Sequence, residues 1–137
     1  MDIPFSVKAF FEVFRTYNQA IWPAQIFAYL LGVAGVVAAI RPRAWTDRAI
    51  GGMLGVLWIW MGAVYHIGFF SAINPLAYVF GAFFLLQGLL FLWKGALSPS
   101  LSFAPRGDLY GWTGGLLLVY AMIVYPVLGS IAGHTYP

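Results

Sequence analysis

Between Ala49 and Trp93 the chain runs for 45 residues without a Lys, Arg, Asp or Glu. A single straight helix of this length would extend about 67 Å, roughly twice the thickness of the hydrocarbon core of a bilayer. The run must therefore fold back, and the Ser-Ala-Ile-Asn-Pro sequence at 71–75 is the break within it. The pattern predicts two membrane-spanning helices joined by a tight turn.

The composition supports the same interpretation, because 62% of the 137 residues are hydrophobic and only 8% are charged. An ordinary soluble domain carries about 25% charged residues. Little chain remains outside the apolar segments, so residues 1–137 are predicted to form a single membrane domain. The chain has no cysteine, which excludes disulfides, thiolate metal sites and cysteine nucleophiles.

The predicted fold class is all-α, an integral membrane bundle of four transmembrane helices with a short amphipathic N-terminal helix. The spans are expected at about residues 21–40, 49–70, 76–93 and 109–129, and the amphipathic helix at 6–20, with Ser6 as its N-cap. Two placements of this N-terminal helix stay open. It lies in the membrane interface with its apolar face down, or it packs on the bundle.

The distribution of basic residues predicts the orientation. Four spans place the loops 41–48 and 94–108 on one side, and both termini and the 71–75 turn on the other. The loop side carries five basic residues, Arg41, Arg43, Arg48, Lys94 and Arg106. The other side carries two, Lys8 and Arg15. Because basic residues accumulate in cytoplasmic loops, we expect these loops in the cytoplasm and both termini in the periplasm. Basic residues spread between spans also argue against a nucleic-acid partner.

Glycines recur at helical spacing in the predicted spans, where they allow two helix backbones to approach closely. The spacing indicates packing within the bundle more than dimerisation, although a homo-oligomer stays open. The predicted packing residues are Gly51, Gly55, Gly62, Gly81, Gly88, Gly111 and Gly115.

Strongly polar groups at membrane depth are functional candidates, and here most of them gather toward the predicted outer half of the spans. His66 follows the glycine stripe and is expected to face protein. It is either a proton-accepting, metal-binding or ligand-contacting imidazole, or a neutral histidine hydrogen-bonded inside the bundle. The candidates for an outward-facing ligand vestibule are Asn18, Trp22, Gln25, Tyr65, His66, Asn74, Tyr78 and Tyr125.

Two prolines carry structural predictions. Asn74 and Pro75 are expected to be the N-cap and first residue of the third span. Pro126 withholds a backbone hydrogen-bond donor and is expected to kink the last span near Met122.

Catalytic and cofactor motifs are absent from the sequence. There is no acidic pair in the spans, no H-E-x-x-H, no G-x-S-x-G and no phosphate-binding loop, so we expect no enzyme. His66 and His134 are weak candidates for metal or haem ligands, but no third ligand accompanies them at metal-site spacing. The prediction is therefore a chain with no metal and no cofactor.

Several strings in the sequence resemble an uncharacterised, domain-of-unknown-function family of small bacterial polytopic membrane proteins. They are Tyr-Asn-Gln-Ala-Ile-Trp-Pro-Ala-Gln at 17–25, Val-Tyr-His at 64–66, Phe-Phe-Ser-Ala-Ile-Asn-Pro at 69–75 and Val-Tyr-Pro at 124–126. The resemblance implies a location in the bacterial inner membrane and brings no established activity. It also implies that relatives continue past Pro137, in which case the surroundings of His134 are incomplete.

The leading functional hypothesis is a non-catalytic membrane protein, either an accessory or assembly subunit of a larger complex or a stand-alone structural bundle. One alternative is a small oligomeric carrier or channel with an outward-facing polar vestibule around His66. The other is a haem- or metal-binding redox subunit. The expected partners are the lipid bilayer and, for the first hypothesis, another membrane protein.

Overall fold

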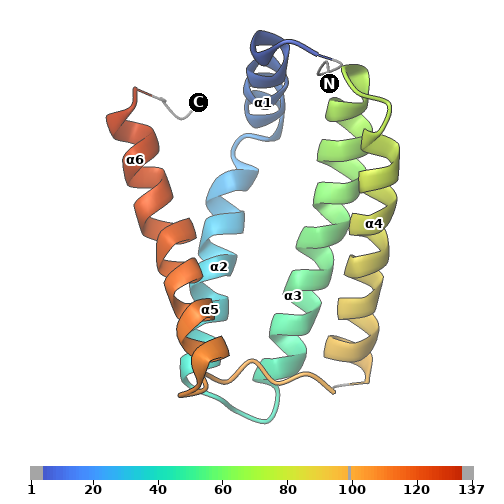
Figure 1. Ribbon diagram of the computed structural model, residues 1–137. Helices are drawn as coiled ribbons and strands as arrows, with labels where there is room; N and C mark the ends of the chain where they lie inside the picture. The colour runs from blue at the N-terminus through green and yellow to red at the C-terminus, as the bar shows by residue number, and fades with distance from the viewer. Residues whose placement is uncertain (1–4, 99, 134–137) are drawn as a thin grey trace.

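The computed structural model describes residues 5–98 and 100–133, and these residues form helices and no strands. Figure 1 shows the long helical segments side by side in the order α4 (Ala77–Leu90), α3 (Thr46–Trp60), α2 (Ala24–Ile40) and α5–α6 (Leu109–Ile131), with α1 (Val7–Ile21) at one end. The connections 41–45 and 98–108 lie at the opposite end. The all-helical fold class is therefore confirmed.

The predicted hairpin is the best-packed part of the molecule. Its first arm is continuous from Thr46 to Ala72 and consists of α3 (Thr46–Trp60), the π-helical η1 (Met61–Phe69) and the 3₁₀ turn η2 (Phe70–Ala72). Its second arm consists of α4 (Ala77–Leu90) and the π-helical η3 (Phe91–Leu97). Both arms are long and apolar enough to cross a membrane.

Asn74 caps the turn of the hairpin, whereas the N-cap of helix α4 is Leu76 and not Asn74 as predicted. The buried side-chain Oδ1 of Asn74 accepts a hydrogen bond of 3.1 Å from the backbone amide of Leu76. This bond satisfies one of the amide groups that the first turn of a helix leaves without a helical partner. The regular helix α4 begins at Ala77, slightly later than the expected start at residue 76.

The first predicted span begins later than expected, at Ala24. Helix α1 (Val7–Ile21) and helix α2 (Ala24–Ile40) meet at Trp22-Pro23 with a bend of 85°. The expected continuous helix at 21–40 is corrected to a 17-residue α2, because Pro23 has no amide hydrogen to continue α1. Within the described residues, three helices are long and apolar enough to span a membrane, or four if the bent α1–α2 pair is one span.

The N-terminal helix begins where the sequence predicts, because the side chain of Ser6 accepts a hydrogen bond from the amide of Ala9. Its Tyr17 is buried against the end of the hairpin. Helix α1 therefore packs on the end of the hairpin.

The last helical segment runs from Leu109 to Ile131 through α5 (Leu109–Val119), the π-helical η4 (Tyr120–Val124) and α6 (Tyr125–Ile131). It begins at Asp108, whose side chain accepts a hydrogen bond from the amide of Gly111. The π-helical turn η4 ends two residues before Pro126 and includes Met122, where the kink is predicted.

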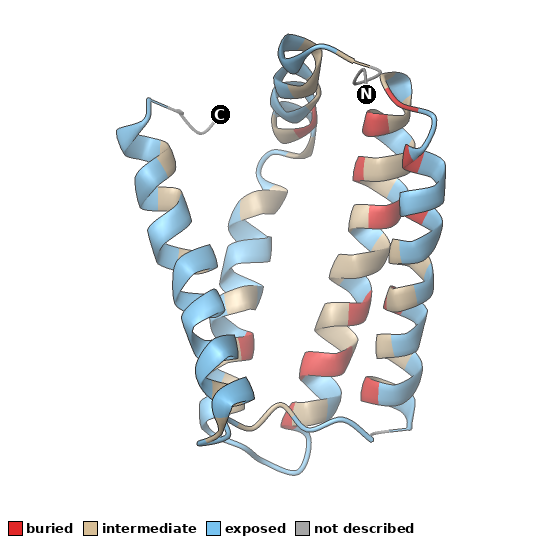
Figure 2. Ribbon diagram, viewed as in Figure 1, coloured by how far each residue is buried: buried red, intermediate tan, exposed pale blue. Residues whose placement is uncertain are grey.

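Burial is unevenly distributed over these segments. Figure 2 shows buried residues along the hairpin and none on α5–α6. A hydrophobic cluster of buried side chains lies where α1 meets the hairpin, and consists of Tyr17, Tyr65, Phe70 and Ala77. The tertiary packing is therefore concentrated in α1, α3 and α4.

Candidate functional site

The two arms of the hairpin meet along a seam of glycines. A Cβ atom added to Gly51 would lie 2.6 Å from the Cα of Gly95, and one added to Gly62 would lie 2.9 Å from the carbonyl oxygen of Gly81. These distances are too short for a real Cβ contact, so the two backbones touch. We call Gly51, Gly55, Gly62, Gly81, Gly88 and Gly95 the glycine seam.

Sequence reasoning missed Gly95. It lies seven residues after Gly88, which places it on the same helical face, so the spacing could have found it. Its position in the π-helical turn η3, next to Lys94, set it outside the span that hydropathy predicts. A Cβ atom added to Gly95 would nonetheless lie 2.7 Å from the Cα of Gly51, so Gly95 belongs to the seam.

Among the described residues, Gly111 and Gly115 do not pack against a neighbouring helix as predicted. A Cβ atom at Gly115 would have no atom within 4 Å. One at Gly111 would clash with the carbonyl of Arg106, which belongs to the connection that leads into the same helix. Gly111, in the first turn of α5, therefore allows the connection at Arg106 to lie close to the start of its own helix.

An aromatic cluster holds α1 on the end of the hairpin. The Tyr17 ring lies edge-on to Tyr65, with centroids 5.1 Å apart, and edge-on to Phe69 at 5.5 Å. Its hydroxyl accepts a 3.0 Å hydrogen bond from the indole nitrogen of Trp60. Sequence reasoning did not single out Tyr17 as a site residue, although it lies seven residues after Phe10 on the apolar side of the predicted helix.

His66 is packed among aromatic rings. Its ring centroid lies 4.5 Å from that of Phe84 and 5.1 Å from that of Tyr65. Its Nδ1 is buried and has no hydrogen-bond partner among the described residues. His66 therefore faces protein, as the glycine stripe predicts, but the tyrosine or carbonyl partner expected for a purely structural histidine is not seen at Nδ1.

Asn18, Trp22 and Gln25 form the joint between α1 and α2. The side-chain Nε2 of Gln25 donates a 2.6 Å hydrogen bond to the backbone carbonyl of Asn18, near the end of α1. Such carbonyls have no helical partner, so this bond closes the end of α1 across the bend. The Trp22 side chain between them is half exposed.

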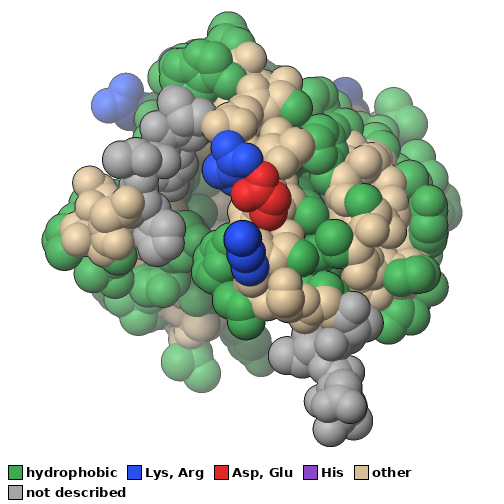
Figure 3. Space-filling model, turned by 90° about the horizontal axis from the view of Figure 1, so that it is seen from above, with side chains coloured by type: hydrophobic (Ala, Val, Ile, Leu, Met, Phe, Trp, Pro, Cys, Tyr) green, Lys and Arg blue, Asp and Glu red, His purple; other side chains and the backbone are tan. Residues whose placement is uncertain are grey.

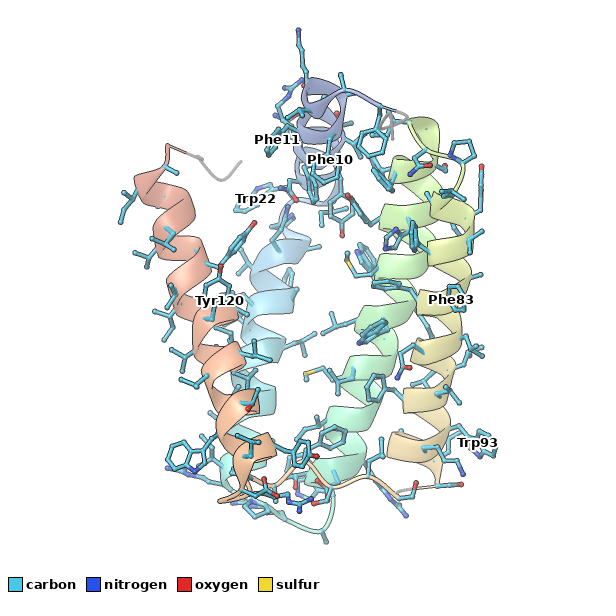
Figure 4. The ribbon with its side chains drawn as sticks, in the orientation of Figure 1. Phe10, Phe11, Trp22, Phe83, Trp93 and Tyr120 are labelled. Carbon is cyan, nitrogen blue, oxygen red and sulfur yellow. The ribbon has the colours of Figure 1, made fainter. Side chains whose placement is uncertain are left out.

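The predicted vestibule is not formed, because its residues lie in different places. Tyr65, His66 and Asn74 belong to the packed end of the hairpin. Tyr78 is exposed and lines a shallow groove on the outer face of α4 with Phe83 and Leu86. Tyr125 is exposed on α6, where Tyr120 is its ring neighbour at 6.4 Å. Figure 4 shows Phe83 and Tyr120 on opposite sides of the molecule.

The residues that the structure describes contain no group of three or more His, Cys, Asp or Glu side chains that could hold a metal ion. His134, the second weak metal candidate, lies outside the described residues. The arrangement around His66 offers one imidazole in aromatic surroundings, which is short of the three protein ligands of a catalytic zinc site.

A protein-family model with the description "Family of unknown function (DUF6064)" matches residues 7–137. No curated protein and no solved structure matches the chain. The family match spans both the hairpin and the α5–α6 segment, so it treats the described elements as one unit.

Proposed function

This chain belongs to the DUF6064 family of unknown function, and we propose that it is a non-catalytic accessory or assembly subunit of a larger complex in a bacterial cytoplasmic membrane. The long apolar helices support the membrane location. The excess of basic residues in the 41–48 and 94–108 loops supports an orientation with these loops in the cytoplasm.

One observation carries the proposed role, namely that the segment Leu109–Ile131 buries none of its most apolar stretch inside the chain. Its contact with the rest of the molecule centres on Met122, whose carbonyl accepts a hydrogen bond from Tyr29 and whose methyl group lies near Gly32. Added Cβ atoms at Gly114 and Gly115 would meet open space.

Small residues matter in membranes because helices associate there by close packing, without a hydrophobic driving force between them. A span with open glycines and almost no internal contacts is therefore suited to packing against a helix of another protein. The glycines of the hairpin, by contrast, already contact the opposite arm, so the hairpin would serve as the rigid part of the subunit.

The alternatives receive less support. A carrier or channel needs a polar path between helices, and the candidate vestibule residues are spread over α1, α2, η1, α4, α6 and two connections. A metal-binding or haem-binding redox subunit needs ligands beyond His66, and its direct test is the metal content and visible absorbance of the purified protein.

The proposed role is tested by purifying the tagged protein from native membranes in mild detergent, followed by native mass spectrometry. We expect the wild-type chain to elute with another membrane protein in a defined stoichiometry. A monodisperse monomer without a partner would contradict the proposal.

Two matched variants show whether α5 makes the contact. Gly115→Leu adds a large side chain to the open face of α5, and Ala82→Leu adds the same side chain to the exposed outer face of α4. The complex should dissociate in Gly115→Leu and persist in Ala82→Leu. Retention of the complex by both variants would remove α5 from the interface.

A further inference from the structure

Helix α1 has a second apolar side that the hairpin does not cover. Its first apolar side, with Phe10, Val13 and Tyr17, packs on η1 and η2. At 100° per residue, Val7, Phe11 and Trp22 lie about 60–120° around the helix from Phe10. Their side chains are 68%, 56% and 51% exposed. We call these three residues the outer apolar strip, and Figure 4 shows Phe11 and Trp22 on the α6 side of α1.

The polar side of α1 faces away from the long helices. Lys8, Glu12 and Arg15 follow one another at helical spacing, and Arg15 forms an ion pair with Glu12. The hydrogen bond from the Arg15 guanidinium holds the pKa of the Glu12 carboxyl below its usual range. In Figure 3, seen from above, basic and acidic side chains lie in a row across the face of the molecule.

The direction of α1 differs from that of the other helices. The 85° bend at Trp22-Pro23 turns it across the axis of α2, at the end of the molecule where the turn of the hairpin also lies. A helix lying across the ends of the spans, with polar residues outward and apolar residues to the side and below, has the arrangement of an interfacial membrane helix.

From this geometry we propose that α1 lies in the membrane surface, with Val7, Phe11 and Trp22 inserted among the lipids at the boundary between headgroups and acyl chains. The proposal rests on the membrane location proposed above. Lipid is the occupant because the strip continues around the same helix into a charged, water-facing side, where Lys8 is long enough to reach lipid phosphates. Trp22 at the end of the strip is the residue type that favours this boundary.

The proposal explains how a short helix crosses the bilayer. Helix α2 has 17 residues, which extend about 25 Å, whereas the hydrocarbon core of a bilayer is about 30 Å thick. If α1 is embedded at the surface, the joint at Asn18 and Gln25 is held at the membrane boundary. The bilayer then thins locally around α2, and α1 and α2 are a surface helix and a span rather than two halves of one span.

The chain has no native cysteine, so single cysteines can report the environment of each position. Phe11→Cys, Val7→Cys and, on the polar side, Gln19→Cys are labelled with an environment-sensitive fluorophore. The proteins are reconstituted into vesicles of phosphatidylcholine and phosphatidylglycerol that contain a nitroxide-labelled lipid. We expect blue-shifted emission and strong quenching by the nitroxide lipid at residues 7 and 11, and neither effect at residue 19.

A label at Val56→Cys, on the exposed face of α3, separates the possible failures. If residue 56 is quenched by the nitroxide lipid but residues 7 and 11 are not, α1 is not embedded and this inference is wrong, while the membrane location stands. If residue 56 is also unquenched, the membrane location itself is wrong. Blue-shifted emission without lipid quenching at residues 7 and 11 would show that protein covers the strip, which also overturns the inference.

Discussion

At the scale of single residues, glycines of the same sequence pattern have different roles. Gly51 and Gly114 both lie in apolar helices, but the first touches the backbone of the opposite arm and the second faces open space. The difference comes from the surroundings, since a missing side chain permits close approach only where a second backbone is present. Substitution by alanine therefore separates the two roles.

For Gly51→Ala we expect a loss of about 1–3 kcal/mol in the free energy of unfolding, because the added methyl group would lie 2.6 Å from the backbone of Gly95. The matched variant Gly114→Ala should be neutral or more stable by up to about 1 kcal/mol, from its higher helix propensity. Reversible unfolding in mixed micelles measures both values. Equal effects of the two substitutions would contradict the proposed role of the glycine seam.

At the scale of helices, side chains supply hydrogen bonds where the regular helical pattern is interrupted. In a regular α-helix the amide of residue 126 would donate to the carbonyl of Met122, but Pro126 has no amide hydrogen. The Tyr29 hydroxyl donates to that carbonyl instead. At the bend between α1 and α2, the Gln25 side chain donates a hydrogen bond to the carbonyl of Asn18. Each of these side-chain hydrogen bonds also connects two helices.

This arrangement predicts coupling between Tyr29 and Pro126. Tyr29→Phe should cost about 1–2 kcal/mol of unfolding free energy, because the Met122 carbonyl loses its partner in apolar surroundings. In a Pro126→Ala background, the new amide at residue 126 can bond that carbonyl, so the same substitution should cost much less. A double-mutant cycle in micelles measures the difference. Additive effects would show that the Tyr29 hydroxyl does not compensate for the proline.

At the scale of the whole molecule, most basic residues lie at one end and the aromatic cluster lies at the other. The end formed by the connections 41–45 and 98–108 carries most basic residues, and the opposite end carries α1, the hairpin turn and the aromatic cluster. The connection before α5 is also fixed to α3, because the Asp47 carboxylate accepts a 2.9 Å hydrogen bond from the amide of Phe103. The two ends thus differ in both charge and architecture.

The proposed orientation is tested by labelling two single-cysteine variants in intact cells. Ala72→Cys, exposed near the turn of the hairpin, should react with a membrane-impermeant maleimide from the periplasm. Ala44→Cys, exposed in the connection between α2 and α3, should react only after the membrane is permeabilised. The reverse result would overturn the orientation and place α1 in the inner leaflet.

The hairpin, its capped turn and the helical class followed from the sequence, because a long uncharged run with a single Asn-Pro break has few physical solutions in an apolar solvent. The sequence also identified Gly51, Gly55, Gly62, Gly81 and Gly88, because helical periodicity places them on matching faces.

Only the tertiary structure decided which predicted features meet. It separated Tyr78 and Tyr125 from His66, buried Tyr17 against Tyr65 and left Gly115 without a neighbour among the described residues. These outcomes depend on helix directions and on contacts between distant segments, such as the 85° bend that brings α1 over the hairpin. Periodicity determines which side of a helix is apolar, but the partner of that side depends on how the other helices pack.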